Sequence, residues 1–269
     1  MIFIGEKING AIPAVGAAIA ARDDAEIRRR VRLQAEAGAD YIDCAPSTEP
    51  QEEYAAMVWL LDIIQSETEL PVCLDSPNAA LLARILREDL VRRPGMINSV
   101  NEEADKCELL FPLVAGTDWR VVGLCCDETG IPAEPERRVA IAERIIAKAD
   151  TFGVAREKLF IDPCVMALAT APSAMADTEK CIALLRERAP EVKTAAALSN
   201  ISYNMPARKY VNLGCVAYAV RAGLDAAILD PCSVDLISTV YACEALCMQD
   251  KGGRKYNRAW RQGRIGAKK

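Results

Sequence analysis

The chain has 269 residues, of which 51% are hydrophobic, a length and composition that fit one α/β barrel or two smaller domains. The formal net charge is −5, but residues 251–269 hold eight Lys or Arg and no acid, so residues 1–250 carry 25 basic against 38 acidic residues, a net of −13. An acidic body is a poor match for a polyanion, so we predict no nucleic-acid partner. We interpret residues 251–269 as a basic C-terminal extension that is solvated or packs on an acidic neighbour.

The sequence contains 11 cysteines but no CxxC pair and no histidine. Several cysteines lie in or beside apolar runs, as free thiols do in a reducing compartment, so we predict a cytoplasmic protein. The absence of histidine excludes a Ser-His-Asp triad, an HExxH motif and a histidine zinc site. A thiolate site around Cys243 and Cys247 is conceivable, but without a second spaced pair we predict no bound metal.

The apolar stretch at residues 11–21 is interrupted by Pro13 and Gly16. It is too short to span a bilayer, and it lacks the basic segment and Leu-rich run of a signal peptide. We therefore predict no membrane partner.

Apolar runs of strand type alternate with helical patterns along the chain. In the helix at 24–37, Asp23 and Glu26 suit an N-terminal capping box, and Gly38 is the stop. The predicted strands are residues 1–5, 40–44, 71–75, 95–99, 120–126, 158–162, 194–199 and 225–230. The predicted helices are 24–37, 51–66, 78–90, 102–115, 134–151, 175–187, 207–221 and 234–248.

Eight strands and eight helices in strict alternation predict a (β/α)₈ TIM barrel, with near-continuous apolar strands of the kind found in parallel sheets. The segments "AEAGADYIDCAP" and "VRAGLDAAILDP" are partly self-similar, which favours the same fold. An open doubly wound sheet is the competing fold, but "GEKING" is not the glycine-rich turn that it would need. We predict one domain over residues 1–250, followed by the extension at 251–269.

A polar residue stands at or just after the end of every predicted strand. These residues are Glu6, Asp43, Asp75, Asn98, Asp127, Asp162, Asn200 and Asp230. In a barrel all carboxyl ends of the strands meet at one face, where active sites lie. Asp75 and Asp230 could instead cap the helices that follow them. A mouth of carboxylates and amides suits a flat heterocycle rich in N–H donors, and we predict that it binds a pterin.

Seven motifs then resemble the strand ends of the methyltetrahydrofolate:corrinoid protein methyltransferases, in the superfamily that includes dihydropteroate synthase and the folate domain of methionine synthase. The motifs are "FIGEKING", "CLDSPN", "MINSVN", "DETGIP", "FIDPCV", "LSNISYN" and "GLDAAILDP", in order over residues 1–247. The resemblance implies methyl transfer between N5 of tetrahydrofolate and the cobalt of a corrinoid on a partner protein. It also implies tetrahydrofolate or 5-methyltetrahydrofolate as the substrate.

The same resemblance implies roles for individual residues. Asp75, Asn98 and Asp162 would hydrogen-bond the pterin ring, Asn200 would face N5 as the catalytic residue, and Arg208 would lie near the p-aminobenzoate or glutamate portion. The full set of expected binding residues is Glu6, Asp75, Asn98, Asp162, Ser199, Asn200, Tyr203 and Arg208. The chain departs from its relatives at Cys44–Ala45 and at Tyr203, where Gln is frequent.

Two other functions stay open at this point. A dihydropteroate synthase-like enzyme would need phosphate contacts at the last strands, whereas this chain ends its eighth strand in "ILDPCS". A non-catalytic folate-binding subunit would keep the same ring contacts. We also predict a homodimer that associates through the outer helix at 207–221, because the corrinoid needs the mouth open.

Overall fold

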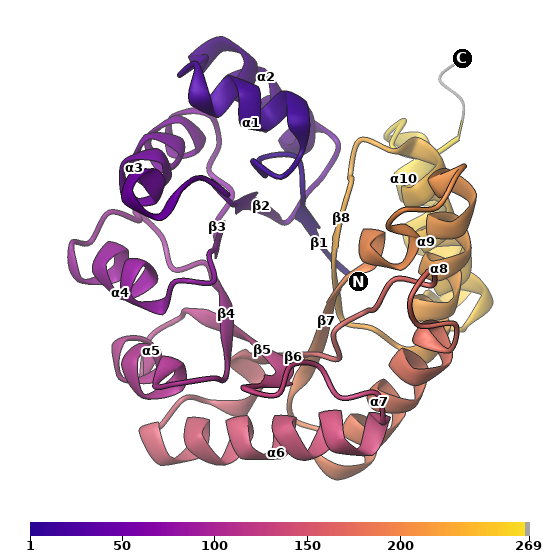
Figure 1. Ribbon diagram of the computed structural model, residues 1–269. Helices are drawn as coiled ribbons and strands as arrows, with labels where there is room; N and C mark the ends of the chain where they lie inside the picture. Colours follow the sequence, from indigo (N-terminus) through magenta and orange to yellow (C-terminus); the bar gives the residue numbers. More distant parts are fainter. Residues whose placement is uncertain (267–269) are drawn as a thin grey trace.

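Eight parallel strands close into one barrel, with each strand hydrogen-bonded to its neighbours in the sequence and β8 returning to β1. The computed structural model describes residues 1–266. Figure 1 looks down the barrel, with the strands as an inner ring and the helices around it. The strands are β1 (Ile2–Gly5), β2 (Tyr41–Cys44), β3 (Val72–Asp75), β4 (Met96–Glu102), β5 (Arg120–Asp127), β6 (Leu159–Asp162), β7 (Lys193–Ala197) and β8 (Ala226–Leu229). The predicted single-domain (β/α)₈ barrel is confirmed.

The helices form the outer layer. They are α1 (Pro13–Ala20), α2 (Asp24–Glu36), α3 (Pro50–Glu67), α4 (Ala79–Arg87), α5 (Lys106–Val114), α6 (Pro135–Phe152), α7 (Ala174–Arg188), α8 (Arg208–Ala222), α9 (Val234–Leu246) and α10 (Arg254–Arg261). Short 3₁₀ turns are η1 (Arg156–Lys158), η2 (Leu198–Ser202) and η3 (Lys251–Gly253). The expected cap at the start of α2 is present, since the Asp23 side chain accepts the N–H of Glu26. Gly153 ends α6 in the left-handed conformation, with φ +75°.

The core has two layers, separated by the wall of the barrel. Inside the barrel every strand contributes to one cluster: Ile4, Tyr41, Cys73, Met96, Val122, Phe160, Ala195, Ala226 and Ile228. The alternate strand residues pack outward against the helices in two larger clusters. Because side chains alternate along a strand, this inner cluster fixes which residues further along each strand also point inward.

Three local elements differ from the sequence prediction. Residues 13–20 form α1, which starts at a proline and buries Val15, Ala18 and Ile19 at helical spacing. Strand β4 continues to Glu102, where it pairs with Asp127 of β5 across register shifts, so the next helix begins at Lys106 rather than at 102. Because the strand is longer, Asn101 lies in the sheet instead of in a loop.

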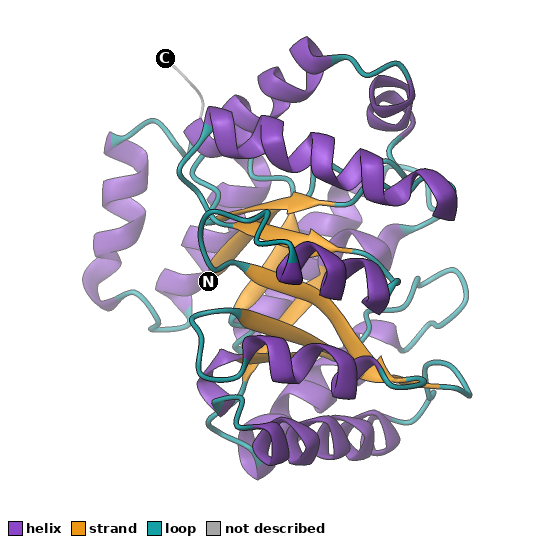
Figure 2. Cartoon of the chain, turned by 90° about the vertical axis from the view of Figure 1, so that its left-hand side faces the viewer, coloured by secondary structure: helices purple, strands orange, loops and turns teal. Residues whose placement is uncertain are grey.

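The basic segment after residue 250 packs on the barrel through α10. The Asp250 carboxylate accepts the backbone N–H groups of Lys255 and Tyr256, each at 3.0 Å, and Ala259 is buried. Arg264 Nη2 donates to the Gly38 carbonyl at 2.9 Å, just before β2 begins. In Figure 2 the N-terminus lies at the opposite end of the barrel from the strand arrowheads. Because Arg264 contacts Gly38 before β2 begins, residues 251–266 pack away from the carboxyl ends of the strands. Within residues 1–266 no helix is both long enough and apolar enough to cross a bilayer.

Candidate active site

A layer of polar side chains lies above the inner apolar cluster, at the carboxyl ends of the strands. Each of these residues stands two positions after a member of that cluster and so points to the same side of the wall. They are Glu6, directly after β1, and Asp43, Asp75, Asn98 and Asp162, which lie in β2, β3, β4 and β6 respectively. The expectation that strand-end acids and amides gather at one mouth is thus met on these five strands.

The other acidic strand ends behave differently. Asp127 is one residue past the inward Cys126 and faces outward: its carboxylate pairs with Arg144 at 3.1 Å and accepts the Thr129 N–H. The expectation that Asp127 faces the mouth is wrong, because strand alternation turns it away. Asp230 pairs with Lys7 at 2.9 Å and accepts the Cys232 N–H, as a turn-forming aspartate does.

Asp162 is the acid with the most defined surroundings. It is 6% exposed, and one carboxylate oxygen accepts the Cys164 N–H at 2.7 Å. Burial raises the pKa of Asp162 to about 7, although backbone N–H groups and the Arg138 charge act in the opposite direction. A ligand that donates two N–H groups to such a buried carboxyl stabilises its ionised form.

Asp75 and Asp43 form a second acidic group across β2 and β3. Burial raises the pKa of Asp75 to about 7, and the nearby Glu53 charge adds to this. Asp43 is fully buried, and neither of its carboxylate oxygens has a hydrogen-bond partner among the described residues. Its pKa lies well above the usual range because of burial and then the Asp75 charge. Asp75 does not cap the next helix, since Asn78 does so through the Leu81 N–H.

Beside Asp75 the mouth opens into a hollow of about 450 Å³ between the loops after β2 and β3. Its lining is Ala45, Ser47, Thr48, Pro50, Glu53, Asp75, Pro77 and Asn78. Glu53 is held by the Ser76 hydroxyl at 2.6 Å, and the Ser76 N–H donates to the Asn98 carbonyl at 2.9 Å. These contacts link β3 to β4 and position the Asp75 and Asn98 side chains.

The turn η2, directly after β7, carries the remaining expected residues. The Ser199 hydroxyl donates to Glu6 at 3.1 Å, which brings the first and seventh strand ends together. Asn200 is exposed at the rim, and Tyr203 is 62% exposed. Arg208 turns back onto η2: its Nε donates to the Ser202 hydroxyl at 2.9 Å and its Nη2 to the Ser199 carbonyl at 2.8 Å. Burial raises the pKa of Glu6.

Sequence reasoning missed Arg138, on α6. It is 2% exposed and donates to the carbonyls of Pro132 at 2.6 Å and Pro163 at 3.1 Å. It thereby fixes the loop that follows Asp162. Its position on the same helical face as the buried Ala142, Ile145 and Ala149 was the signal in the sequence that could have identified it.

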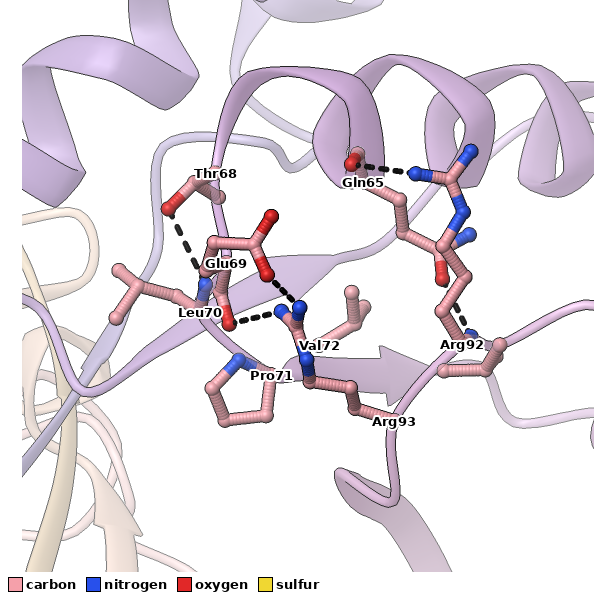
Figure 3. Close-up of a pocket in the computed structure, with 9 residues that line it drawn as sticks. Gln65, Thr68, Glu69, Leu70, Pro71, Val72, Arg92 and Arg93 are labelled. Atoms are coloured by element: carbon pink, nitrogen blue, oxygen red, sulfur yellow. Dashed lines mark hydrogen bonds and ion pairs between the residues drawn. The ribbon is translucent and has the colours of Figure 1, made fainter.

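A smaller hollow of about 30 Å³ lies at the start of β3, at the opposite end of the barrel from the mouth. Figure 3 shows its lining residues: Arg93 contacts Glu69, and the Arg92 N–H donates to the Gln65 side chain at 2.6 Å. These contacts join the loops before β3 and β4, and the space holds little more than water. Residues 1–266 also contain no group of three or more Cys, Asp or Glu side chains arranged around a metal position.

Comparison with known families agrees with this geometry. The pterin binding enzyme family matches residues 16–230, which contain the seven strands from β2 to β8 completely. The chain belongs to this family. The pterin-binding barrel is similar to the methylcorrinoid:tetrahydrofolate methyltransferase of Eubacterium limosum, with 40% identity over 268 residues, 99% of this chain and 98% of that protein.

Other relatives are more distant. The methionine synthases of Mycobacterium tuberculosis and Mycobacterium leprae are each 32% identical over 242 residues, which is 85% of this chain but 20% of those proteins. The dihydropteroate synthase of Xanthomonas albilineans, solved with 7,8-dihydropteroate, superposes with a TM-score of 0.64 at 18% identity, over 91% of this chain and 92% of that one. This last likeness concerns the fold alone.

Proposed function

We propose that the pterin-binding barrel is a methyltransferase that moves a methyl group between N5 of tetrahydrofolate and the cobalt of a corrinoid held by a partner protein. The observation that carries the proposal is the full-length similarity to the Eubacterium limosum methyltransferase together with the inward layer of acids and amides. The name of that relative puts the methyl group on the corrinoid first, and we infer the same direction here, within one-carbon metabolism.

Asp75, Asn98 and Asp162 are proposed to hold the pterin ring. The ring edge presents N–H donors, and a carboxylate can accept two of them in parallel, each charge-assisted bond being worth about 1.5–3 kcal/mol. The raised pKa of Asp75 and of Asp162 supports this, because a donor-rich ligand compensates the cost of an ionised buried carboxylate. Glu6, Ser199 and Tyr203 are proposed to complete the binding surface.

Asn200 is proposed to act at N5. When N5 takes the methyl group from the methylated corrinoid, N5 loses a proton and the cobalt keeps the bonding electron pair as Co(I). In the opposite direction N5 must gain that proton before Co(I) can displace it. An amide hydrogen bond that is stronger in the transition state would assist both directions, with the proton exchanged through water. The exposed position of Asn200 at the rim is compatible with access by a corrinoid.

The test is methyl transfer with purified components. Methylcobalamin or a methylated corrinoid protein is mixed with tetrahydrofolate and the enzyme, and the corrinoid absorbance and 5-methyltetrahydrofolate are followed together. We expect equal amounts of Co(I) and methylated folate to form. Folate binding without any transfer to or from either corrinoid would reduce the protein to a folate carrier and contradict the proposal.

We further propose a homodimer that leaves the mouth free. On the outer face of α8, Tyr210 and Tyr218 are exposed, and a Cβ added at Gly214 between them would meet no atom. Exposed aromatic side chains around a glycine offer a surface that a second copy can approach closely.

The eleven free cysteines support the proposed cytoplasmic location. We also propose residues 1–250 as the catalytic domain and 251–269 as an accessory basic extension.

A further inference from the structure

One arginine is buried beside the barrel mouth without an acidic partner. Arg138, in the first turn of α6, is 2% exposed. Its Nε donates to the Pro132 carbonyl at 2.6 Å, and its Nη1 donates to the carbonyls of Pro163 at 3.1 Å and Cys164 at 3.4 Å. Among residues 1–266 all of its hydrogen bonds go to backbone carbonyls and none to a carboxylate. A buried cation of this kind costs free energy unless it is fully hydrogen-bonded, so its contacts define its role.

These contacts join two of the strand-end motifs. Pro132 belongs to "DETGIP" after β5, and Pro163 belongs to "FIDPCV" after β6. The acid of the first motif, Asp127, faces outward to Arg144 and leaves the mouth without a contact from that motif. Through Arg138 the first motif instead acts on the second, because its Pro132 carbonyl anchors the guanidinium that holds the loop after Asp162.

A single peptide group separates the guanidinium from the Asp162 carboxylate. The Pro163 carbonyl and the Cys164 N–H are the two polar ends of one planar peptide unit, and in a trans peptide they point in opposite directions. The carbonyl end accepts from Arg138 at 3.1 Å, and the N–H end donates to Asp162 at 2.7 Å. A cation at one end and an anion at the other polarise the peptide in the same sense, so each bond strengthens the other.

The backbone of this loop needs an external hold. Cys164 has φ +60°, in the left-handed region that a residue with a Cβ rarely adopts. Such a conformation persists where the surrounding structure fixes it. Arg138 bonds the carbonyls on both sides of that φ angle, those of Pro163 and Cys164. Without these bonds the loop is free to relax, and the Cys164 N–H then leaves Asp162.

We propose that Arg138 is a positioning residue for the pterin site: through the Pro163–Cys164 peptide group it holds the Asp162 carboxylate in place and favours its ionised form, which accepts the N–H donors of the ring. Its effect on the carboxyl is a property of the chain itself, whereas its effect on folate rests on the proposed function. Arg138 takes no part in the methyl-transfer steps described above.

The charges around Asp162 agree with this role. Burial raises the pKa of Asp162 to about 7, and the opposing contributions come from the N–H groups of Cys164 and Ala197 and from the Arg138 charge. Arg138 is therefore the cation that favours the carboxylate.

The other titratable groups around Arg138 and Asp162 are thiols. Burial raises the pKa of Cys125 on β5 and of Cys181 on α7, and the Cys126 thiol and burial raise that of Cys164. These three thiols stay neutral near pH 7. The pKa of Cys126 is lowered to about 7, first by Cys164, so every titration is repeated in a Cys126→Ser background.

Three variants of the full-length protein separate charge from shape. Arg138→Gln keeps an N–H donor near the position of Nε but removes the charge. Arg138→Lys keeps a charge near the position of the guanidinium but lacks the planar fork. Arg144→Gln is the matched control, because Arg144 lies on the same helix and contacts Glu102 and Asp127 outside the barrel.

The first measurement follows the carboxyl directly. Aspartate labelled with ¹³C at the carboxyl carbon is incorporated, the Asp162 signal is identified by its loss in Asp162→Asn, and its chemical shift is recorded from pH 4 to pH 9. We expect a higher pKa of Asp162 in Arg138→Gln than in the wild type, and wild-type values in Arg138→Lys and Arg144→Gln. Equal pKa values in the wild type and Arg138→Gln, or a raised pKa in Arg138→Lys, would overturn the proposal. The lysine variant keeps the test decisive if the glutamine variant does not fold.

The second measurement is tetrahydrofolate affinity. Arg138→Gln should bind at least about tenfold more weakly at pH 7, and the loss should become smaller at pH 8.5, where more of Asp162 is ionised. In an Asp162→Asn background the same substitution should change affinity by less than about twofold, because the carboxylate through which it acts is gone. An equal loss at every pH, or an equal loss in both backgrounds, would show that Arg138 supports the fold only and would overturn its positioning role.

The two measurements distinguish this inference from the proposed function. A protein that binds no tetrahydrofolate, or binds it without methyl transfer, would contradict the proposed function. The shift in the Asp162 titration does not depend on a ligand, so that result would still decide whether Arg138 controls the carboxyl.

Discussion

One oxygen of the Asp162 carboxylate accepts the Cys164 N–H, and the proposed pterin contact uses the other. In the Asp162→Asn variant the amide oxygen can keep the bond to Cys164, but the NH₂ group then faces the donors of the pterin. We expect tetrahydrofolate affinity to fall at least about tenfold, from the loss of one charge-assisted bond of about 1.5–3 kcal/mol. Isothermal titration calorimetry measures the change.

Asp127→Asn is the matched control for this substitution. Asp127 ends the neighbouring strand but pairs with Arg144 outside the barrel. Its replacement should leave folate affinity within about twofold of the wild type. Equal losses in the two variants would mean that net charge, rather than a contact with the ring, determines affinity.

Asn200 differs from the acids because it is exposed and its role is proposed for the transition state. Loss of a single donor of this kind reduces kcat by about 10²–10³ in other enzymes. We expect Asn200→Ala to lower the methyl-transfer rate at saturating folate by about 10²-fold and folate affinity by much less. Stopped-flow transfer to a corrinoid acceptor and equilibrium binding give the two values.

Asn257, on α10 at the other end of the barrel, provides the matched amide control, and Asn257→Ala should leave the rate unchanged. A wild-type rate for Asn200→Ala at saturating folate would show that Asn200 only binds the ring. Another route for the N5 proton would then be required.

At the scale of elements, the Arg208 side chain ties η2 to the start of α8. Arg208 joins the Ser199 carbonyl to the Ser202 hydroxyl, so it fixes the turn that presents Ser199 and Asn200. We expect Arg208→Ala to lower kcat as well as folate affinity, each by about tenfold, because one loosened turn serves both. Arg208→Lys should recover little, since lysine lacks the planar fork that makes two directed bonds.

The control on the same helix is Arg221→Ala, which removes an exposed pair with Glu179 and a contact with the Tyr218 ring, both away from η2. If Arg208→Ala raises KM and leaves kcat at the wild-type value, its main role is contact with the folate tail, as the sequence resemblance implied.

The strand order and the inward acids could be predicted from sequence because parallel strands are apolar runs with polar ends. The sequence could not predict to which side of the barrel wall each strand-end side chain points. Asp127 and Asp43 look alike in the sequence, yet one residue of strand length turns Asp127 outward and leaves Asp43 buried. Helix α1 was missed because small residues give a weak helical pattern. The bond from the Ser199 hydroxyl to Glu6 joins the two ends of the barrel sequence, which periodicity cannot report.

At the scale of the whole molecule, one end of the barrel holds Asp43, Asp75 and Asp162 as buried carboxyls with raised pKa values. In the unfolded chain an aspartate has a pKa of about 3.9. Between about pH 4 and pH 7 the folded protein therefore binds protons that the unfolded chain has released. The contribution of these three acids to stability is fully present below this window and falls as pH rises through it, by up to about 1.4 kcal/mol per pH unit for each proton.

Carboxyl groups with lowered pKa values make stability rise with pH. Their effect is confined to pH values near or below the pKa that they have in the unfolded chain. Glu26, whose pKa Arg29 and Arg30 lower to about 2, is such a group and does not contribute above about pH 5. Between pH 5 and pH 7 the acids of the mouth dominate, because Cys126, whose pKa its hydrogen bonds lower to about 7, opposes them only near the upper end of this interval. We expect urea unfolding at pH 5, 6 and 7 to show a free energy of unfolding that decreases with each step.

Asp43→Asn tests which acid causes the decrease. Asp43 is the most buried of the three and has no partner for either oxygen among residues 1–266, so its ionisation costs the folded state most. An amide cannot ionise, and the variant should lose less stability between pH 5 and pH 7 than the wild type, by up to about 1.4 kcal/mol per pH unit. The exposed Asp62→Asn should keep the wild-type slope. Parallel slopes for Asp43→Asn and the wild type would mean that Asp43 is already ionised in the folded protein at pH 5, and that Asp75 and Asp162 alone link folding to pH.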